Sequence, residues 1–236
     1  MQARNPKDPM GLHEENCIKT NTGGNFNYTT LNALNSTLSE VDPSDFDGII
    51  IGGSGDYSAH HPKSQRWVKP LLKFMEQALD QNVPGFGLCF GHQLLGTVMG
   101  STVETDLSHA EVGTVQLSLT EAGKNDPVFG KLPTSFFAQT GHSDYVTHLP
   151  SGITLLVSGG KVPTQAFRVD GKHFYSTQFH PDLSGQQARE RYRAYREKIK
   201  AQDVDDGETL FLIGKDDATK LLSHFGELLH DLKAST

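Results

Sequence analysis

The chain has 236 residues, enough for one large α/β domain or two small ones, and we expect a single domain. Hydrophobic residues make up 36% of the chain and charged residues 21%, which excludes an intrinsically disordered protein and a coiled coil. The net charge is -7, and this acidic balance argues against non-specific binding to nucleic acid or anionic membranes.

Apolar runs and cysteines indicate the compartment. No stretch of the sequence is apolar for long enough to cross a bilayer, so we expect no membrane association. Residues 1–6 lack the apolar core of a secretory signal. The two cysteines, Cys17 and Cys89, lie far apart, with neither the spacing of a metal site nor a disulfide framework. We therefore expect a reducing, cytoplasmic setting.

The first hundred residues predict a parallel sheet with crossover helices. Only residues 1–3 precede a polar segment, so the first strand is either very short or begins upstream of this chain. Residues 48–53 form an apolar run that opens onto glycines, as in a buried parallel strand before a ligand loop. A strand at 83–89 and a helix at 93–99 follow. Between the two strands, a helix with its start near Pro70 is predicted by apolar residues at three- and four-residue spacing, namely Val68, Leu71, Leu72, Met75 and Leu79.

The middle of the chain predicts a different strand arrangement. Short apolar or alternating segments follow one another closely, at 112–119, 136–137, 153–157, 166–169 and 174–179. Closely spaced strands of this kind indicate an antiparallel or mixed extension of the sheet. The predicted fold class is thus α/β, with a mostly parallel, doubly wound sheet, flanking helices and an antiparallel extension.

The end of the chain is predicted to be helical. Apolar residues within 218–232 form an amphipathic stripe, which indicates a helix packed on the domain surface, with a partner-binding role as the alternative. The segment 189–200 carries six basic and two acidic residues, and we expect a solvated helix face there rather than a docking surface. We therefore expect a single domain at 1–236, of which residues 185–236 are a helical tail packed on the rest.

A candidate nucleophile lies at residues 87–91, whose sequence Gly-Leu-Cys-Phe-Gly has the form of a nucleophile elbow between a strand and a helix. A nucleophile held in such a strained turn needs small residues two positions away on either side. The following helix N-terminus would favour the thiolate of Cys89, and the amide of Phe90 would point toward an oxyanion. A buried structural cysteine beside helix-packing glycines fits these five residues equally well.

A glycine loop follows the first predicted strand, at residues 52–55. Its backbone amides are not obstructed by large side chains, which suits a second oxyanion donor or a phosphate cradle. The loop is not a P-loop, because no Gly-Lys-Ser/Thr follows it.

A thiolate nucleophile requires a base, and His180 stands out among the eleven histidines. His180 closes a predicted strand, and Asp182 lies two residues on, where an extended chain projects it to the same side. The pair at 60–61 lies in a polar loop without a nearby carboxylate or thiol pattern, where we expect solvent exposure rather than a metal site. We expect His92 to be structural rather than catalytic. The residues alone thus support an acyl-transfer hypothesis with Cys89 as nucleophile, His180 as base and Asp182 as its orienter.

Four segments of the chain, in order, resemble class I glutamine amidotransferases, most of all the glutaminase domain of GMP synthase and its stand-alone relatives. They are Ile-Ile-Gly-Gly-Ser-Gly-Asp at 50–56, Gly-Leu-Cys-Phe-Gly-His-Gln at 87–93, Gly-His-Ser-Asp-Tyr-Val at 141–146 and Gln-Phe-His-Pro-Asp at 178–182. Together they cover roughly residues 46–184. The resemblance implies the flavodoxin-like α/β core of that family.

The resemblance also implies a mechanism. Cys89 would attack the side-chain amide of L-glutamine and give a γ-glutamyl thioester and ammonia. His180 would transfer protons, and Asp182 would orient its ring. The backbone amides of Gly53 and Phe90 would hold the oxyanion.

Substrate recognition is implied for a second set of residues. Gln93, four residues after the nucleophile, matches a position that helps to place the substrate glutamine. The segment 141–144 would contact the α-amino and α-carboxylate groups, largely through its main chain; its members with side chains are His142, Ser143 and Asp144. Neither a metal nor an organic cofactor is implied, because covalent acyl transfer needs neither.

Two features depart from the family pattern. The family usually has Glu where this chain has Asp182, which is shorter by one methylene, roughly 1.5 Å of reach. An orienting contact is sensitive on that scale, so either the backbone compensates or the triad is weaker. The second departure is that only about fifty residues follow the last motif, and we expect no ATP-binding synthetase domain among them.

Three hypotheses follow for the function. The first is a glutaminase subunit that donates ammonia to a separate synthetase, and it predicts that activity rises with the partner. The second is a stand-alone hydrolase of γ-glutamyl amides or peptides, which predicts full activity alone and a roomier pocket. The third is a catalytically weak binding or regulatory homologue, supported by Asp182 and the abbreviated start of the chain.

Overall fold

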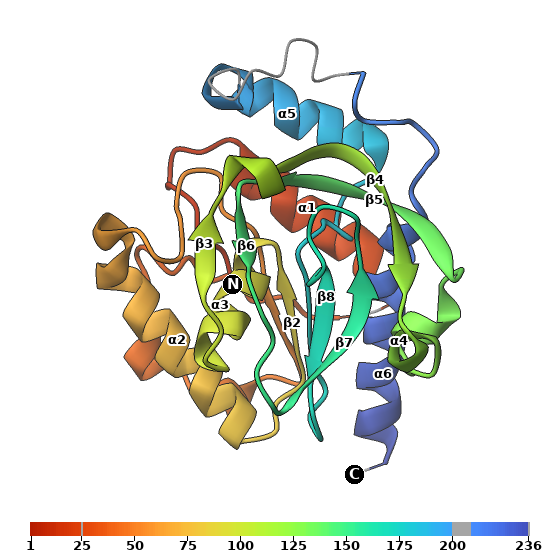
Figure 1. The fold of residues 1–236 in the computed structure, drawn as a ribbon. Helices are drawn as coiled ribbons and strands as arrows, with labels where there is room; N and C mark the ends of the chain where they lie inside the picture. The colour runs from red at the N-terminus through yellow and green to blue at the C-terminus, as the bar shows by residue number, and fades with distance from the viewer. Residues whose placement is uncertain (25, 200–208, 236) are drawn as a thin grey trace.

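The main sheet of the protein has seven strands in the order β1-β2-β9-β8-β7-β4-β5. The computed structural model describes residues 1–24, 26–199 and 209–235 (Figure 1). The seven strands are β1 (Ile49–Ile51), β2 (Gly85–Leu88), β4 (Glu111–Leu119), β5 (Ser135–His142), β7 (Ile153–Ser158), β8 (Ala166–Val169) and β9 (Phe174–Thr177). A second, two-stranded sheet pairs β3 (Val103–Thr105) with β6 (Asp144–Val146).

Six α-helices surround the sheets in the described part of the chain. They are α1 (Met10–Thr22), α2 (Gln65–Asp80), α3 (Phe90–Val98), α4 (Glu121–Lys124), α5 (Gly185–Ile199) and α6 (Lys220–Ala234). No helix in the described ranges has the length and apolar character required to span a membrane.

The parallel part of the sheet positions three chain segments at one edge. β1 pairs with β2 in parallel, and β2 pairs with β9 in parallel, with Leu88 opposite Thr177. Because carboxyl ends of parallel strands meet at the same edge, the segments that follow β1, β2 and β9 lie together there. These segments are the glycine loop 52–55, the elbow at Cys89 and the turn that carries His180.

The rest of the main sheet is antiparallel. β8 pairs antiparallel with β9 and β7, and β4 pairs antiparallel with β7 and β5. The strands predicted for the middle of the chain are therefore present, and the predicted α/β class with a mostly parallel core and an antiparallel extension is confirmed.

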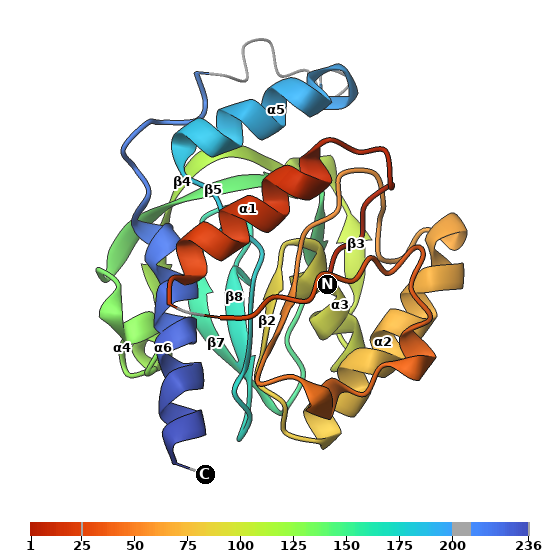
Figure 2. The ribbon, with the colours of Figure 1, turned by 180° about the vertical axis from the view of Figure 1, so that it is seen from behind.

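Two apolar cores lie on opposite faces of the sheet. In β1, Ile49 and Ile51 pack with α2 and α3, whereas in β2 Phe86 and Leu88 pack with α6. The alternation of side chains along a strand separates these two sets. Figure 2 shows α1 and α6 in front of the sheet, with α3 behind β2. The amphipathic stripe predicted at the end of the chain belongs to α6, whose Leu221, Leu222 and Phe225 are fully buried.

Helix α2 begins earlier than predicted. It starts at Gln65, directly after a single turn at Pro62–Ser64 in which the His61 side chain accepts a hydrogen bond from the amide of Lys63. Pro70 lies inside the helix and is exposed. Its missing N–H deprives the Arg66 carbonyl of its usual helix partner, but both residues are exposed, so this carbonyl is on the side of the helix that water can reach.

The N-terminal region contains a helix that the sequence pattern did not predict. Helix α1 has weak amphipathic character because polar and apolar residues mix on its faces, yet it packs against α6 and α5. Residues 1–3 run beside β1, where the Gly52 amide donates to the Met1 carbonyl at 2.9 Å. On their other side, Gln2 forms a parallel bridge with Asn32. A very short extended segment thus occupies the place of the expected first strand.

Candidate active site

Cys89 lies in a strained turn between β2 and α3. Its backbone has φ 49° and ψ -93°, in the region of positive φ that non-glycine residues rarely adopt. A Cβ at Gly87 would lie 2.6 Å from the Gly91 carbonyl oxygen, and one at Gly91 would lie 2.5 Å from the Ile51 carbonyl oxygen. The two flanking glycines therefore make the turn possible, as a nucleophile elbow requires.

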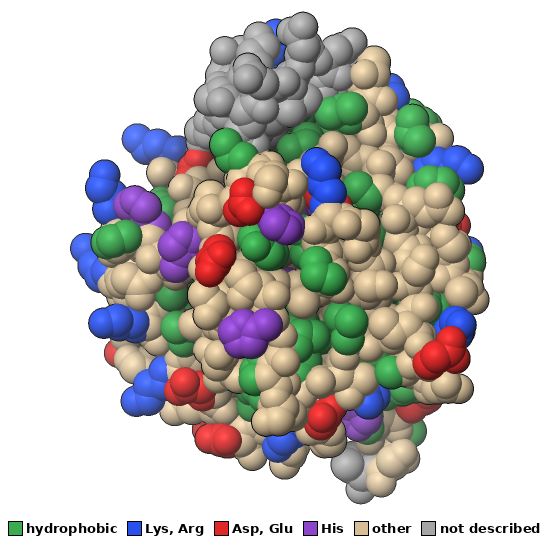
Figure 3. Space-filling model, in the orientation of Figure 1, with side chains coloured by type: hydrophobic (Ala, Val, Ile, Leu, Met, Phe, Trp, Pro, Cys, Tyr) green, Lys and Arg blue, Asp and Glu red, His purple; other side chains and the backbone are tan. Residues whose placement is uncertain are grey.

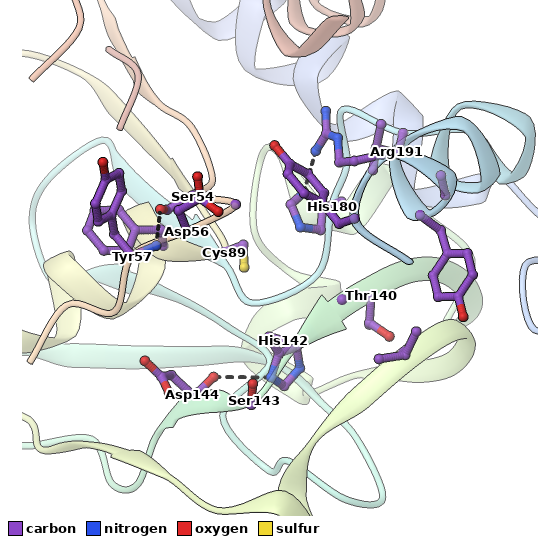
Figure 4. A pocket seen from close by; sticks show the side chains of 18 of the residues that line it. Ser54, Asp56, Tyr57, Cys89, Thr140, His142, Ser143, Asp144, His180 and Arg191 are labelled. Atoms are coloured by element: carbon purple, nitrogen blue, oxygen red, sulfur yellow. Dashed lines mark hydrogen bonds between the residues drawn. The ribbon is translucent and has the colours of Figure 1, made fainter. Parts of the chain in front are cut away.

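The elbow opens into a cavity of about 340 Å³. Figure 4 shows Cys89 between the loop with Ser54 and Tyr57 on one side and His180 with Arg191 on the other. His142, Ser143 and Asp144 form a further wall of the cavity, so three segments distant in sequence converge on the sulfur. Of the nine predicted site residues, the cavity is lined by Cys89, Phe90, Gln93, His142, Ser143, Asp144 and His180. The other two, Gly53 and Asp182, are buried directly behind it.

His180 and Asp182 form a hydrogen-bonded pair. Nδ1 of His180 lies 3.0 Å from Oδ1 of Asp182, and the Asp182 side chain is completely buried. The His180 amide donates to the Gln139 carbonyl at 2.8 Å, which fixes the turn against β5. With Nδ1 directed at the carboxylate, Nε2 is the ring nitrogen left to interact with the sulfur of Cys89.

The electrostatics of this pair favour an imidazolium. Burial alone would lower the pKa of His180, but the charges of Asp182 and then of Cys89 outweigh burial and raise the pKa to about 9. Burial likewise opposes ionisation of Asp182, yet Arg191 and His180 hold the pKa of that carboxyl well below its usual range. The arrangement therefore favours a protonated His180 beside the Cys89 sulfur.

Two backbone amides, those of Phe90 at the elbow and Gly53 in the glycine loop, lie close to the proposed nucleophile and base. The amide of Phe90 belongs to the first turn of α3, which leaves it without an intrahelical acceptor. A Cβ at Gly53 would lie 3.1 Å from Cε1 of His180, so this loop is directly beside the histidine. Neither amide has a hydrogen-bond partner among the described residues. Both are thus available to an oxyanion.

Gln93 connects the elbow helix to the wall at 142–144. Its Nε2 donates to the Asp144 carbonyl at 2.9 Å, and the side chain is almost fully buried. Each ring nitrogen of His142 faces an oxygen acceptor: the Asp144 carbonyl lies 3.1 Å from Nδ1, and the Glu111 carboxylate lies 3.2 Å from Nε2. These contacts fix the main chain of the wall, the feature that substrate recognition through backbone groups requires.

Two buried side chains at the centre were not singled out from the sequence. Gln178 Nε2 lies 3.6 Å from the Cys89 sulfur, and its Oε1 lies 3.4 Å from Nε2 of Gln93. Arg191, from α5, donates to Oδ2 of Asp182 at 2.9 Å. Gln178 is the first residue of the motif that contains His180, so its position was a usable signal. Arg191 lies on a separate helix, and no sequence pattern indicated its contact with Asp182.

A buried ion cluster lies behind the glycine loop. Arg4 donates to Glu14 at 2.5 Å and to the Tyr195 hydroxyl at 2.6 Å, and Asp8 accepts from the same hydroxyl. A Cβ at Gly52 would overlap Glu14, so the loop is pressed against α1. The cluster joins the N-terminal segment, α1 and α5 around the loop, an arrangement that no local sequence pattern indicated.

Two expectations about charged segments need correction. The segment 189–200 was expected to form a solvated helix face, and Glu190, Arg193 and Arg196 are indeed exposed. Arg191 and Tyr192 depart from this expectation: they are buried and line the cavity, because α5 folds back over the site. Residues 200–208 of the chain lie outside the described ranges.

His60 is exposed as expected, yet its Nδ1 lies 3.8 Å from a carboxylate oxygen of Asp144, which the sequence did not place nearby. Figure 3 shows histidine and acidic side chains gathered over β3 and β6 on this face. His92 is buried and bonded to Ser176 at 2.9 Å, in agreement with a structural role.

Comparison with known sequences gives a consistent result. The family model of glutamine amidotransferase class-I matches residues 20–196. GMP synthase [glutamine-hydrolyzing] of Ectopseudomonas mendocina is 34% identical over 141 residues, 58% of this chain and 25% of that protein. The corresponding protein of Streptomyces avermitilis is 32% identical over 149 residues, 61% of this chain and 26% of that protein. This chain thus spans about a quarter of the length of these curated relatives.

The fold has a close structural neighbour as well. A glutamine amidotransferase from Thermotoga maritima superposes with a TM-score of 0.72, and the match covers 98% of this chain and 96% of that one. The identity is 19%, so this likeness supports the fold alone.

Proposed function

Because the chain belongs to the class I glutamine amidotransferase family of enzymes, we propose that it hydrolyses the side-chain amide of L-glutamine at Cys89. The observation that carries the proposal is the strained Cys89 in one cavity with the buried His180–Asp182 pair. A structural cysteine would need neither positive φ nor a charged histidine beside it.

The first half of the reaction forms a thioester. The Cys89 sulfur attacks the γ-carbonyl carbon of glutamine, and the amides of Gly53 and Phe90 stabilise the resulting oxyanion. His180, protonated at Nε2, donates that proton to the amide nitrogen as the carbon–nitrogen bond breaks. Ammonia leaves, and a γ-glutamyl thioester remains on Cys89.

The second half regenerates the enzyme. His180, now neutral at Nε2, takes a proton from a water molecule, and the hydroxyl attacks the thioester carbon. The carbon–sulfur bond breaks, glutamate leaves, and the sulfur shares the returned proton with His180. Asp182 remains ionised throughout and holds the ring in the orientation that both steps need.

Within this proposal the ammonia passes to a separate synthetase. The relatives named above are glutamine-hydrolysing GMP synthases, and this chain matches about a quarter of their length. We place the reaction in the cytoplasm, which agrees with two cysteines that form no disulfide.

A second candidate function is hydrolysis of N-substituted γ-glutamyl amides or peptides. One part of the cavity wall is apolar and aromatic, formed by Val112, Leu183, Ala188, Tyr192 and Phe211. Ammonia as the leaving group has no apolar part to bury against such a surface, whereas an apolar substituent on the amide nitrogen would be buried there. Free glutamine remains the preferred substrate because the family match and the relatives both point to it.

The test is a comparison of substrates with Cys89→Ala as control. Purified wild-type chain is assayed for ammonia release from L-glutamine and for cleavage of γ-glutamyl-phenylalanine. We expect turnover of glutamine that the Cys89→Ala substitution abolishes without loss of the fold. A higher kcat/KM for the dipeptide favours the second candidate, and glutamine turnover that survives in Cys89→Ala overturns the mechanism.

A further inference from the structure

The two oxygens of the Asp182 carboxylate have different partners. Oδ1 faces Nδ1 of His180 at 3.0 Å, and Oδ2 accepts a hydrogen bond from Nη2 of Arg191 at 2.9 Å. All three side chains are at least nine-tenths buried. A carboxylate held at both oxygens has its χ2 torsion fixed from two directions. A single contact would leave the carboxylate free to turn about that bond.

Arg191 reaches Asp182 from a helix that is itself anchored. The amide of Gly185, at the start of α5, donates to Asp216 at 2.6 Å, and Arg189 donates to the Phe211 carbonyl at 2.9 Å. The carbonyl of Asp182 accepts from Asn21 of α1 at 2.9 Å. Helices α5 and α1 thus fix the guanidinium and the carboxylate relative to each other.

We propose that Arg191 is a positioning residue that aligns the short carboxylate of Asp182 with His180 and keeps it ionised. The inference rests on the proposed function, because it assigns a partner to the orienting group of that reaction. A planar, rigid guanidinium suits this task, since it holds Nη2 at Oδ2 of Asp182 in a fixed direction while Nη1 lies beside the His180 ring. The second contact offers a physical answer to how an aspartate orients a catalytic histidine here.

The geometry also sets a limit on what Arg191 can do. Its Nη1 lies 3.3 Å from Nδ1 of His180, where Asp182 also points. A guanidinium can donate to Nδ1 only when that nitrogen has no proton, which would put the ring proton on Nε2. Neutral His180 could not then accept a proton from Cys89 or water. The carboxylate of Asp182 excludes this state, so Arg191 assists catalysis only while Asp182 is ionised.

Other ionisable groups surround the pair and are common to all the variants below. From α1, His13 and Cys17 lie near the charges of both Asp182 and Arg191. From α5, Tyr195 lies near the charge of Arg191. In the described part of the chain, the Asp182 carboxylate is hydrogen-bonded to His180 and Arg191 and to none of these groups. A difference between Arg191 variants therefore reports the guanidinium rather than these groups.

The first test measures kcat, KM and their pH dependence in Arg191→Met, Arg191→Lys and Arg193→Met. Arg193 is exposed on the same helix and serves as the matched control. For Arg191→Met we expect kcat at pH 7 to fall about 10- to 100-fold, with KM within about threefold of wild type. Its acid limb should move up by about one to three pH units, because an adjacent cation lowers the pKa of a carboxyl by that amount.

Arg191→Lys keeps the charge and loses the planar guanidinium, so we expect a smaller loss of kcat and little movement of the acid limb. Arg193→Met should match wild type within about twofold. A wild-type kcat and acid limb in Arg191→Met would overturn the proposal. If that variant does not fold, Arg191→Lys decides alone, and a kcat equal to wild type would overturn the role of the planar guanidinium.

A second readout needs no glutamine. The rate of alkylation of Cys89 by iodoacetamide, followed by intact mass from pH 4 to 9, reports the thiolate directly, with Cys89→Ala as the blank. We expect Arg191→Met to react about tenfold more slowly than wild type on the acid side. If wild type releases no ammonia but alkylation keeps this dependence on Arg191, the proposed function fails and the positioning role stands. Equal alkylation profiles would refute the positioning role whatever the substrate.

Discussion

Two buried histidine–carboxylate pairs lie at the same cavity and differ in what the second ring nitrogen contacts. His180 uses Nδ1 for Asp182 at 3.0 Å, and His142 uses Nε2 for Glu111 at 3.2 Å. The other nitrogen of His142 is occupied by the Asp144 carbonyl at 3.1 Å, whereas that of His180 faces the Cys89 sulfur. A histidine whose two nitrogens both face fixed protein oxygens has a structural role. A histidine with one nitrogen left for a reacting atom can transfer protons.

The two pairs also arise differently along the chain. Asp182 follows His180 by two residues, whereas Glu111 and His142 are opposite one another on the antiparallel strands β4 and β5. Glu111 accepts a further bond from Gln165 at 2.6 Å, which ties the cross-strand pair to the segment before β8. Burial and a carboxylate partner are thus common to both pairs. The neighbour of the second ring nitrogen is what sets His180, the proposed base, apart from His142.

The largest expected effect is on kcat, and it distinguishes the His180–Asp182 pair from the His142–Glu111 pair. Asp182→Asn should lower kcat about 1,000- to 10,000-fold, because an amide no longer enforces the required tautomer of His180. Steady-state ammonia release from L-glutamine, with circular dichroism as a check of the fold, measures it. A loss of less than tenfold would mean that another group orients His180.

The pH profile gives the next expected effect. The pKa of His180 is raised to about 9, so the imidazolium that protonates the leaving amine should persist to that pH, and kcat/KM should fall above it. The same shift makes the charged pair stabilise the fold fully below the ordinary histidine pKa of about 6.5, and this contribution is lost as pH rises through 9. In Asp182→Asn the basic limb should move down toward the ordinary value. An unmoved basic limb would assign it to another group.

Glu111→Gln should affect stability more than rate. It leaves a hydrogen-bonding side chain at the position but removes the charge that binds His142 and Gln165, and we expect a loss of about 1–3 kcal/mol in the free energy of unfolding. Urea denaturation measures this loss, and kcat should stay within about threefold of wild type. A fall in kcat as large as that of Asp182→Asn would put the two pairs in the same functional class.

His60→Ala should have the smallest effect. His60 is exposed, and its distance of 3.8 Å from Asp144 is typical of a weak surface ion pair. We expect the free energy of unfolding to change by no more than about 0.5 kcal/mol and KM for glutamine to change by less than about twofold. A tenfold rise in KM would instead place His60 in the substrate site.

The features that could be predicted from the sequence are those with a local physical constraint. Positive φ at Cys89 demands small residues at 87 and 91, and the two-residue spacing places Asp182 beside His180. Such constraints leave a pattern within a few residues, so the elbow, the loop at 52–55 and the orienting pair were all expected.

The remaining features depend on contacts between distant segments. Arg191 meets Asp182 only because α5 folds back over the site, and Arg4 meets Glu14 only because α1 packs beneath the glycine loop. The weak amphipathic character of α1 provided no periodic signal, and the basic residues at 189–200 favoured a solvated face over a docking surface. Long-range burial of this kind is decided by tertiary packing, which no local pattern encodes.

The most direct test of the central claim is covalent labelling of Cys89. The purified chain is incubated with a γ-electrophilic analogue of glutamine, such as a diazoketone, with and without L-glutamine, and its intact mass is measured beside Cys89→Ala. The account predicts one adduct, located on Cys89 and suppressed by L-glutamine. Absence of an adduct, while a small generic alkylating agent still reaches Cys89, would contradict a glutamine pocket built around this sulfur.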